Sequence, residues 1–205
     1  MDLRGAREAM VVTQIAARGV RDPRVLAALR EVPRHRFVPA GLQAEAHGDH
    51  PLPIGCGQTI SQPYIVAFMA EALELTGVER VLEVGSGSGY FAAVLARLAG
   101  EVVALELEPE LASGSARLLA ALGIGNVAVH IADGARGWPE GAPYDAIALS
   151  CTAREIPEAL WAQLAPRGVL LAPVGAPWET QWLTRWRGGP AHSERLLPVA
   201  FVPLR

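Results

Sequence analysis

A glycine-rich stretch after an apolar run is the part of this sequence best suited to chemistry. Residues 81–90 read VLEVGSGSGY, and an amphipathic pattern over residues 91–98 follows them. A strand, a tight turn and a helix N-terminus in this order are how α/β proteins bind cofactors that contain adenosine. The stretch therefore predicts a cofactor site.

Three side chains around the turn indicate which cofactor. Tyr90 stands where a dinucleotide fingerprint has its third glycine. Glu83 precedes the turn, where a carboxylate repels a pyrophosphate but attracts a ligand carrying an ammonium and a sulfonium. The pattern thus favours S-adenosyl-L-methionine over NAD. Glu106 ends the next apolar run and can accept both hydrogen bonds of a ribose diol, although a water-facing charge is an equal alternative for that residue alone.

Length and composition limit the protein class. At 205 residues, with 51% hydrophobic and 19% charged residues, the chain fits one sizeable α/β domain with a filled core. The net charge of −3, without a basic stripe, predicts no nucleic-acid partner. No signal peptide or membrane-spanning run is visible, and two separate cysteines suit a reducing cytoplasm, so we expect a cytoplasmic protein.

Strands and helices are expected to alternate from residue 80 onward, which predicts a mostly parallel, twisted sheet with helices on both faces. An antiparallel pair over residues 180–186 and 196–202 is expected to finish it. The expected strands after residues 80–84 are 101–106, 127–131, 144–149 and 168–173, and the expected helices are 91–98, 109–122 and 157–164.

The N-terminal region is predicted to be helical with one irregular part. Apolar spacing favours a helix over residues 6–17, and Asp22 before Pro23 is an N-cap signal for a second one. Residues 34–53 show no regular period. Ser61, just before a proline, is a further candidate N-cap.

Beyond these patterns, the sequence resembles a known family along nearly its whole length. Residues 53–64, PIGCGQTISQPY, are similar to the signature of protein-L-isoaspartate O-methyltransferases, and other methyltransferases lack this stretch. Further matching segments are residues 22–26, 32–39, 81–90, 133–139, 144–147, 155–157, 173–175 and 201–204. The resemblance implies a single Rossmann-like methyltransferase domain over residues 1–205. Residues 1–79 would be a helical and loop region covering the active site, and residues 80–205 the cofactor-binding sheet.

The resemblance also implies an activity. An S-adenosyl-L-methionine-dependent protein carboxyl O-methyltransferase of this family methylates the free α-carboxylate of L-isoaspartyl residues in damaged proteins, which initiates repair. S-adenosyl-L-homocysteine is the other product. The methyl ester closes to a succinimide, whose hydrolysis returns some normal aspartate. A carboxylate is already ionised near neutral pH, so no strong general base is needed.

Carried over residue by residue, the resemblance names a site. Ser61 would position the acceptor carboxylate, and Thr59, Ile60 and Gln62 would shape the loop around the substrate. The cofactor would be bound by Glu83, Gly85, Ser86, Gly87, Gly89, Glu106, Asp133 and Gly134. Two of these have plain structural alternatives: Ser61 as a helix N-cap worth about 1 kcal/mol, and Asp133 in an ordinary Asp-Gly turn.

Other readings stay open at this point. The chain could be an inactive homologue that binds the cofactor as a binding module, or a related methyltransferase that modifies one dedicated peptide. His47, Cys56 and Phe91 depart from the residues more common in the family, which leaves the shape of the substrate pocket open. The potential ligands around residues 47–56 lack the spacing of a zinc site, so no metal is expected. We expect a monomer.

Overall fold

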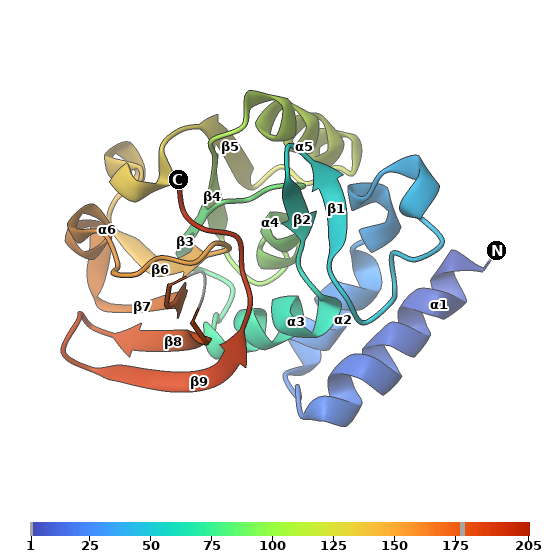
Figure 1. Cartoon of the computed structure of the whole chain (residues 1–205), viewed down its shortest axis with the longest axis horizontal. Helices are drawn as coiled ribbons and strands as arrows, with labels where there is room; N and C mark the ends of the chain where they lie inside the picture. Colours follow the sequence, from blue (N-terminus) through green and yellow to red (C-terminus); the bar gives the residue numbers. More distant parts are fainter. Residues whose placement is uncertain (1, 177–178) are drawn as a thin grey trace.

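Apolar strands from residue 80 onward assemble into one twisted sheet in the computed structural model, which describes residues 2–176 and 179–205 (Figure 1). The strand order is β5-β4-β3-β6-β7-β8-β9. The bounds are β3 Arg80–Val84, β4 Glu101–Glu106, β5 Val127–Ile131, β6 Tyr144–Leu149, β7 Leu164–Val174, β8 Gln181–Arg187 and β9 Ser193–Val199. Neighbours from β5 to β7 pair in parallel, and β8 and β9 add on antiparallel. The predicted mostly parallel sheet with an antiparallel finish is confirmed.

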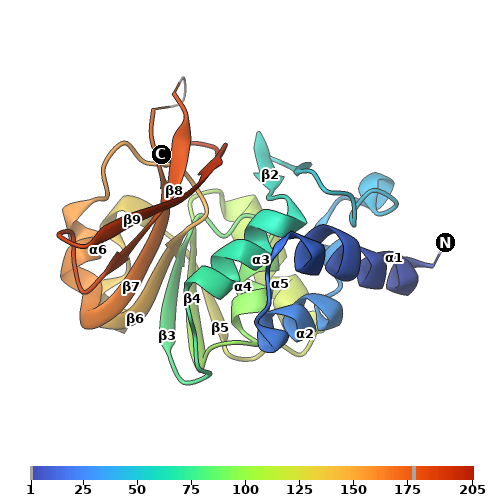
Figure 2. The ribbon, with the colours of Figure 1, turned by 90° about the horizontal axis from the view of Figure 1, so that it is seen from below.

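Helices cover both faces of the sheet, as predicted (Figure 2). Because successive strand residues point to opposite faces, Val81 joins the core under one helical layer and Leu82 the core under the other. One face carries α3 Pro63–Ala72, α4 Tyr90–Leu95 and α5 Pro109–Ala121, and the other carries α6 Glu158–Gln163 with the short 3₁₀ turns Gly134–Arg136 and Pro139–Gly141. Glu83 points to the same face as Val81, towards α3 and α4.

The N-terminal region packs beside α3 rather than on the sheet (Figure 2). The predicted first helix is present as α1 Leu3–Ala9, which continues as a π-helical turn, Met10–Ile15, and a 3₁₀ turn, Ala16–Arg18. The second helix is α2 Pro23–Glu31, and the Asp22 carboxylate accepts a hydrogen bond from the backbone N–H of Arg24 at 2.8 Å. The predicted N-cap is therefore confirmed.

A small hairpin was missed by the sequence patterns. Residues 34–53 were expected to be irregular, but they contain two 3₁₀ turns, Arg34–Phe37 and Ala40–Leu42, and the start of β1 Leu52–Gly55. β1 pairs antiparallel with β2 Gln58–Ile60. The two strands are too short to show a period, and the connecting residues 55–57 all have positive φ angles.

Element ends differ modestly from expectation. The helix after the glycine turn stops at Leu95 instead of residue 98, β7 is longer than expected, and β9 begins and ends three residues early. Such shifts are usual, since helix and strand ends depend on tertiary contacts. Within the described residues no helix has the length and apolar character needed to cross a membrane.

Candidate active site

The glycine turn lies at the carboxyl end of β3, where the chain order of the sheet reverses. β4 follows β3 on one side, whereas β6 lies on the other. In open α/β sheets this switch point is where ligands bind. Gly85 and Gly87 have φ angles of 81° and 52°, in the left-handed region that favours glycine. The backbone N–H groups of Gly85 and Ser86 donate to the carbonyl of Leu105 at 2.9 and 3.0 Å, so the turn is anchored to the end of β4.

The Glu106 carboxylate organises this turn from the end of β4. Its Oε2 accepts a hydrogen bond from the Gly87 N–H at 2.7 Å, and its Oε1 accepts one from the Glu108 N–H at 2.9 Å. The side chain is buried and borders a cavity of about 60 Å³ that Gly85, Gly87 and Gly134 also line. Each carboxylate oxygen can accept more than one hydrogen bond, so Glu106 can also accept from a ligand.

Glu83 lies deeper and has fewer partners. Its side chain is fully buried, and its Oε1 accepts a hydrogen bond from the Ser150 hydroxyl at 3.0 Å. Its Oε2 has no partner within the described residues. Burial raises the pKa of Glu83 to about 8, the hydrogen bond from Ser150 opposes that rise, and the negative charge of Glu106 adds to it. A cation placed here would restore ionisation.

A small cavity of about 30 Å³ brings the turn and the signature loop together. Glu83, Ser86 and Ser150 line it from the sheet, and Ser61 lines it from the loop before α3. The hydroxyl of Ser86 is buried and has no partner within the described residues. Thr59, Ile60, Gly85 and Gly87 also line this cavity. Unpartnered buried polar atoms of residues that line free space, Glu83 Oε2 and the Ser86 hydroxyl among them, fit a polar ligand better than an apolar one.

Ser61 does not cap the helix that follows it. The N-cap of α3 is Gln62, and no side-chain hydrogen bond caps this end. The N-cap alternative for Ser61 is therefore wrong. The proline at the first helical position needs no N–H acceptor, which lowers the demand for a cap. The Ser61 hydroxyl instead faces the cavities.

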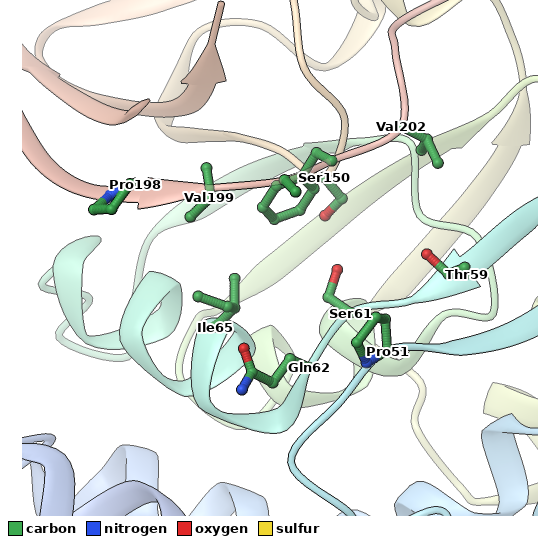
Figure 3. Close-up of a pocket in the computed structure, with 11 residues that line it drawn as sticks. Pro51, Thr59, Ser61, Gln62, Ile65, Ser150, Pro198, Val199 and Val202 are labelled. Carbon is green, nitrogen blue, oxygen red and sulfur yellow. The ribbon is translucent and has the colours of Figure 1, made fainter. Parts of the chain in front are cut away.

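A larger cavity of about 600 Å³ opens beside this small one (Figure 3). Ser61 and Ser150 face it from opposite sides. Its remaining lining is mostly apolar and comes from Pro51, Ile65 and the segment 198–202, with Thr59 and Gln62 at the signature loop. The Gln62 amide also donates to the carbonyl of Asp49 at 3.0 Å, which fixes this loop to the preceding one.

Three predicted cofactor residues lie less centrally. Gly89, with a φ of 82°, borders neither small cavity, and a Cβ there would lie 2.9 Å from the Cβ of Ser115, so it serves the packing of α4 on α5. Asp133 accepts a hydrogen bond from the Ala135 N–H at 2.9 Å and forms the N-cap of a 3₁₀ turn. Gly134 lines the 60 Å³ cavity, and a side chain there would collide with Val84.

Ser150 and the C-terminal segment were not identified from the sequence. Ser150 follows β6, and its N–H donates to the carbonyl of Val84 at 2.8 Å. The segment 202–205 lines the 60 Å³ cavity because Thr152 exchanges backbone hydrogen bonds of 2.8 Å with Val202 and Leu204. Parallel pairing of β6 with β3 could have suggested Ser150, but nothing in the sequence indicates where the tail folds back.

A second set of polar side chains, which we call the N-terminal polar cluster, consists of Arg34, His35, His47 and Tyr90. The Arg34 side chain is fully buried, its Nε donates to the carbonyl of Ala46 at 2.7 Å, and its guanidinium lies 4.9 Å from the centre of the Tyr90 ring. Burial, with the positive charges nearby, lowers the pKa of His47 to about 4. His47, one of the departures from the family pattern, therefore belongs to this cluster.

The other two departures lie in different places. Cys56 is exposed at the tip of the β1–β2 hairpin with a φ of 52°. Phe91 is buried and lines the small cavity beside Ser61. In the part of the chain that the structure describes, no three His, Cys, Asp or Glu side chains gather as they would around a metal ion.

Comparison with known proteins identifies relatives of the whole chain. The family model described as protein-L-isoaspartate(D-aspartate) O-methyltransferase matches residues 6–205. Protein-L-isoaspartate O-methyltransferase 2 of Anaeromyxobacter sp. (strain Fw109-5) is 57% identical over 97% of this chain and 83% of its own length. Protein-L-isoaspartate O-methyltransferase 1 of Rhodopseudomonas palustris (strain HaA2) is also 57% identical, over 97% of this chain and 82% of its own.

Solved structures are similar in fold as well. A protein-L-isoaspartate O-methyltransferase superposes with a TM-score of 0.88 at 29% identity, and the match covers 96% of this chain but only 65% of that protein. A candidate protein-L-isoaspartate O-methyltransferase of Plasmodium falciparum, solved with S-adenosyl-L-homocysteine, gives a TM-score of 0.81 at 26% identity over 97% of this chain and 98% of its own.

Proposed function

The chain belongs to the protein-L-isoaspartate(D-aspartate) O-methyltransferase family, and we propose that it methylates the free α-carboxylate of L-isoaspartyl residues in damaged proteins. The methyl donor is S-adenosyl-L-methionine, and the product ester closes to a succinimide that begins repair. The observation that carries this proposal is the shared cavity. There Ser61 of the signature loop meets Glu83 and the glycine turn.

The described residues fit the cofactor. Glu83 offers an unpartnered, buried carboxylate oxygen for the ammonium group, and the Ser86 hydroxyl is a second unpartnered group. Glu106, at the 60 Å³ cavity, suits the ribose hydroxyls. Gly85 and Gly87 let the backbone approach the ligand because no side chain intervenes. When bound, S-adenosyl-L-methionine supplies an electrophilic methyl group on a positively charged sulfur.

Asp133, Gly134 and Gly89 complete the proposed cofactor site. Asp133 directly precedes Gly134, which lines the 60 Å³ cavity, and would accept from the adenine amino group with Oδ2, which lies 3.5 Å from the Arg136 Nε and does not cap the 3₁₀ turn. Gly134 lines the 60 Å³ cavity at a position where a side chain would collide with Val84. Gly89 acts at one remove, because it allows α4 to pack closely on α5 and so fixes the turn before it.

On the acceptor side, the chain's own residues bind, orient and exclude water. The 600 Å³ cavity would hold the damaged peptide, and the Ser61 hydroxyl would donate a hydrogen bond to its α-carboxylate. Thr59, Ile60 and Gln62 would shape the loop, which the Gln62 bond to Asp49 holds in place. The acceptor is ionised near neutral pH, so orientation in a dry pocket supplies most of the acceleration.

The remaining expectations form part of the same proposal. Residues 1–79 would cover the site of one domain formed by residues 1–205. The partners would be isoaspartyl-containing peptides and proteins, with no nucleic acid, and the protein would act as a monomer in the cytoplasm.

Transfer of a labelled methyl group tests the proposal. A peptide with one L-isoaspartyl residue should be methylated, and its twin with a normal aspartyl linkage should not. Label on neither peptide, with the cofactor bound, would reject the activity and favour an inactive binding module. Equal label on both would contradict the proposed substrate.

A further inference from the structure

Ser150 lies where the 600 Å³ cavity, proposed to hold the substrate, meets the 60 and 30 Å³ cavities, proposed to hold the cofactor. It lines the 600 Å³ cavity, the 60 Å³ cavity and the 30 Å³ cavity, as Thr59 also does. Figure 3 shows it across the larger cavity from Ser61. Its backbone is held by the bond from its N–H to Val84, so its side chain leaves a fixed point of the sheet edge.

Among the described residues, the Ser150 hydroxyl is the group that donates a side-chain hydrogen bond to the Glu83 carboxyl group. It donates to Oε1 at 3.0 Å, while Oε2 is buried without a partner. A serine hydroxyl has a single proton to donate, so this bond selects one orientation of the carboxyl group. In that orientation Oε2 is the oxygen left for a ligand.

The surroundings of Glu83 contain no compensating cation among the described residues. The ionisable group that acts on it is Glu106 from β4, and the buried Cys151 thiol just after β6 is neutral because burial raises its pKa to about 12. α3 and α4 add Val66, Phe91 and the neutral phenol of Tyr90 to the cavity wall. A buried carboxyl group in such surroundings favours its protonated form, and only an incoming positive charge reverses that preference.

We propose that Ser150 is a positioning residue for Glu83, and that the pair binds the cofactor's ammonium group with release of a proton. The Oε–H bond of Glu83 breaks, the proton passes to the solvent buffer, and the ammonium keeps its own three protons. Ser150 donates to the resulting carboxylate throughout. This inference rests on the proposed cofactor role of Glu83.

The pKa of Glu83, about 8, sets the conditions for a test. Calorimetric titration with S-adenosyl-L-homocysteine at pH 7, in buffers with different ionisation enthalpies, measures proton release directly. The wild-type protein should release close to one proton per ligand, falling towards none well above pH 8. Binding heats that do not depend on the buffer would overturn the proton release.

Variants separate the role of Ser150 from a structural one. Ser150→Ala should weaken S-adenosyl-L-homocysteine binding roughly tenfold to hundredfold, because a hydrogen bond to a charged group is lost. It should also move the midpoint of the pH dependence upward. Ser150→Thr should restore both, since it keeps the hydroxyl. Thr184→Val is the matched control: its hydroxyl donates to the carbonyl of Trp182 on β8 and the residue lines none of the three cavities, so the affinity and midpoint should not change.

The titration of the Glu83 carboxyl group can also be measured in the free protein, without any cofactor. The infrared carbonyl-stretch band of a protonated carboxylic acid, assigned as the one lost in Glu83→Gln, should titrate at higher pH in Ser150→Ala and at the wild-type pH in Ser150→Thr. An unmoved band would reject the positioning role. If Ser150 merely lines the cavity wall, only the KM for the peptide would change in Ser150→Ala.

The outcomes distinguish this inference from the proposed function. If Glu83→Gln binds S-adenosyl-L-homocysteine as tightly as the wild type, the cofactor role of Glu83 fails, and the inference fails with it. If Glu83→Gln binds weakly but Ser150→Ala binds normally with an unmoved midpoint, the cofactor role stands and only the part of Ser150 is wrong.

Discussion

Glu83 and Arg34 are both fully buried ionisable residues: Glu83 stands just before the glycine turn, and Arg34 lies against Tyr90, which directly follows the turn. In the N-terminal polar cluster, the Arg34 guanidinium lies over the Tyr90 ring and its Nε donates to the carbonyl of Ala46. Glu83 lines the 30 Å³ cavity and, among the described residues, keeps one oxygen free of protein partners. Burial of an ionisable group thus accompanies close packing around Arg34, whereas around Glu83 it accompanies free space that suits the proposed ligand.

The two regions should also respond to pH in opposite directions. The folded state holds the pKa of Glu83 above its ordinary value, so between about pH 4.5 and 8 the folded protein binds the extra proton and stability falls as pH rises. His47 has a pKa of about 4 in the folded state, below its ordinary 6.5. The unfolded chain then binds the extra proton, and stability falls as pH drops through that window.

The largest expected effect is that of Glu83→Gln on cofactor affinity. Removing the charge that faces the ammonium should weaken S-adenosyl-L-homocysteine binding roughly a hundredfold or more, as for other buried charge pairs. The free energy of unfolding at pH 8 should stay equal or rise, because a buried carboxylate with an unpartnered oxygen is lost. Glu101→Gln, at an exposed strand start, is the control. If Glu83→Gln were destabilised but bound S-adenosyl-L-homocysteine normally, Glu83 would have a structural role like that of Arg34.

Ser61→Ala should affect turnover and leave cofactor binding alone. The loss of one hydrogen bond to the acceptor carboxylate should lower kcat/KM for an isoaspartyl peptide roughly tenfold to hundredfold. Affinity for S-adenosyl-L-homocysteine by calorimetry should be unchanged, and Ser193→Ala on β9 should behave as wild type in both assays. Unaltered turnover would remove Ser61 from the mechanism.

Substitutions in the N-terminal polar cluster should change the free energy of unfolding and leave the cofactor affinity unchanged. Between about pH 6.5 and 4, protonation of His47 in the unfolded chain should cost on the order of 2 kcal/mol of stability. His47→Gln should remove this contribution, and the pH dependence that remains comes from His35, whose pKa burial also lowers, and in the opposite direction from Glu83. Urea unfolding across this pH range measures it. If His47→Gln instead changed cofactor affinity at neutral pH, the separation of the two regions would be wrong.

The sequence predicts the framework of this comparison well, but only part of the site. Strands β3, β4 and β6 have the predicted bounds because a buried parallel strand shows as an apolar run. The positions of Glu83 and Glu106 follow from their place at strand ends. The N-terminal polar cluster could not be predicted, since Arg34 and His47 meet Tyr90 only through tertiary contacts. The position of the C-terminal tail could not be predicted for the same reason, whereas Ser150 directly follows a predicted strand and could have been suggested.

Ser61 shows where a local signal misleads. A serine two residues before a proline resembles an N-cap, yet the helix begins one residue later with no side-chain cap. The spacing of Ile65, Met69 and Leu73, four residues apart, is typical of a helix face, and in the structure Met69 and Leu73 are buried while Ile65 borders the 600 Å³ cavity. The sequence pattern shows that Ser61 could cap a helix, but in the structure Ser61 lines two cavities and does not cap α3.

A crystal structure with S-adenosyl-L-homocysteine and an isoaspartyl peptide tests the central claim most directly. We expect the ligand's ammonium within hydrogen-bond distance of Glu83 Oε2, with Ser150 still bonded to Oε1, and the peptide carboxylate at the Ser61 hydroxyl. A ligand seated elsewhere, with the Glu83 carboxyl group still lacking a cation, would contradict the claim.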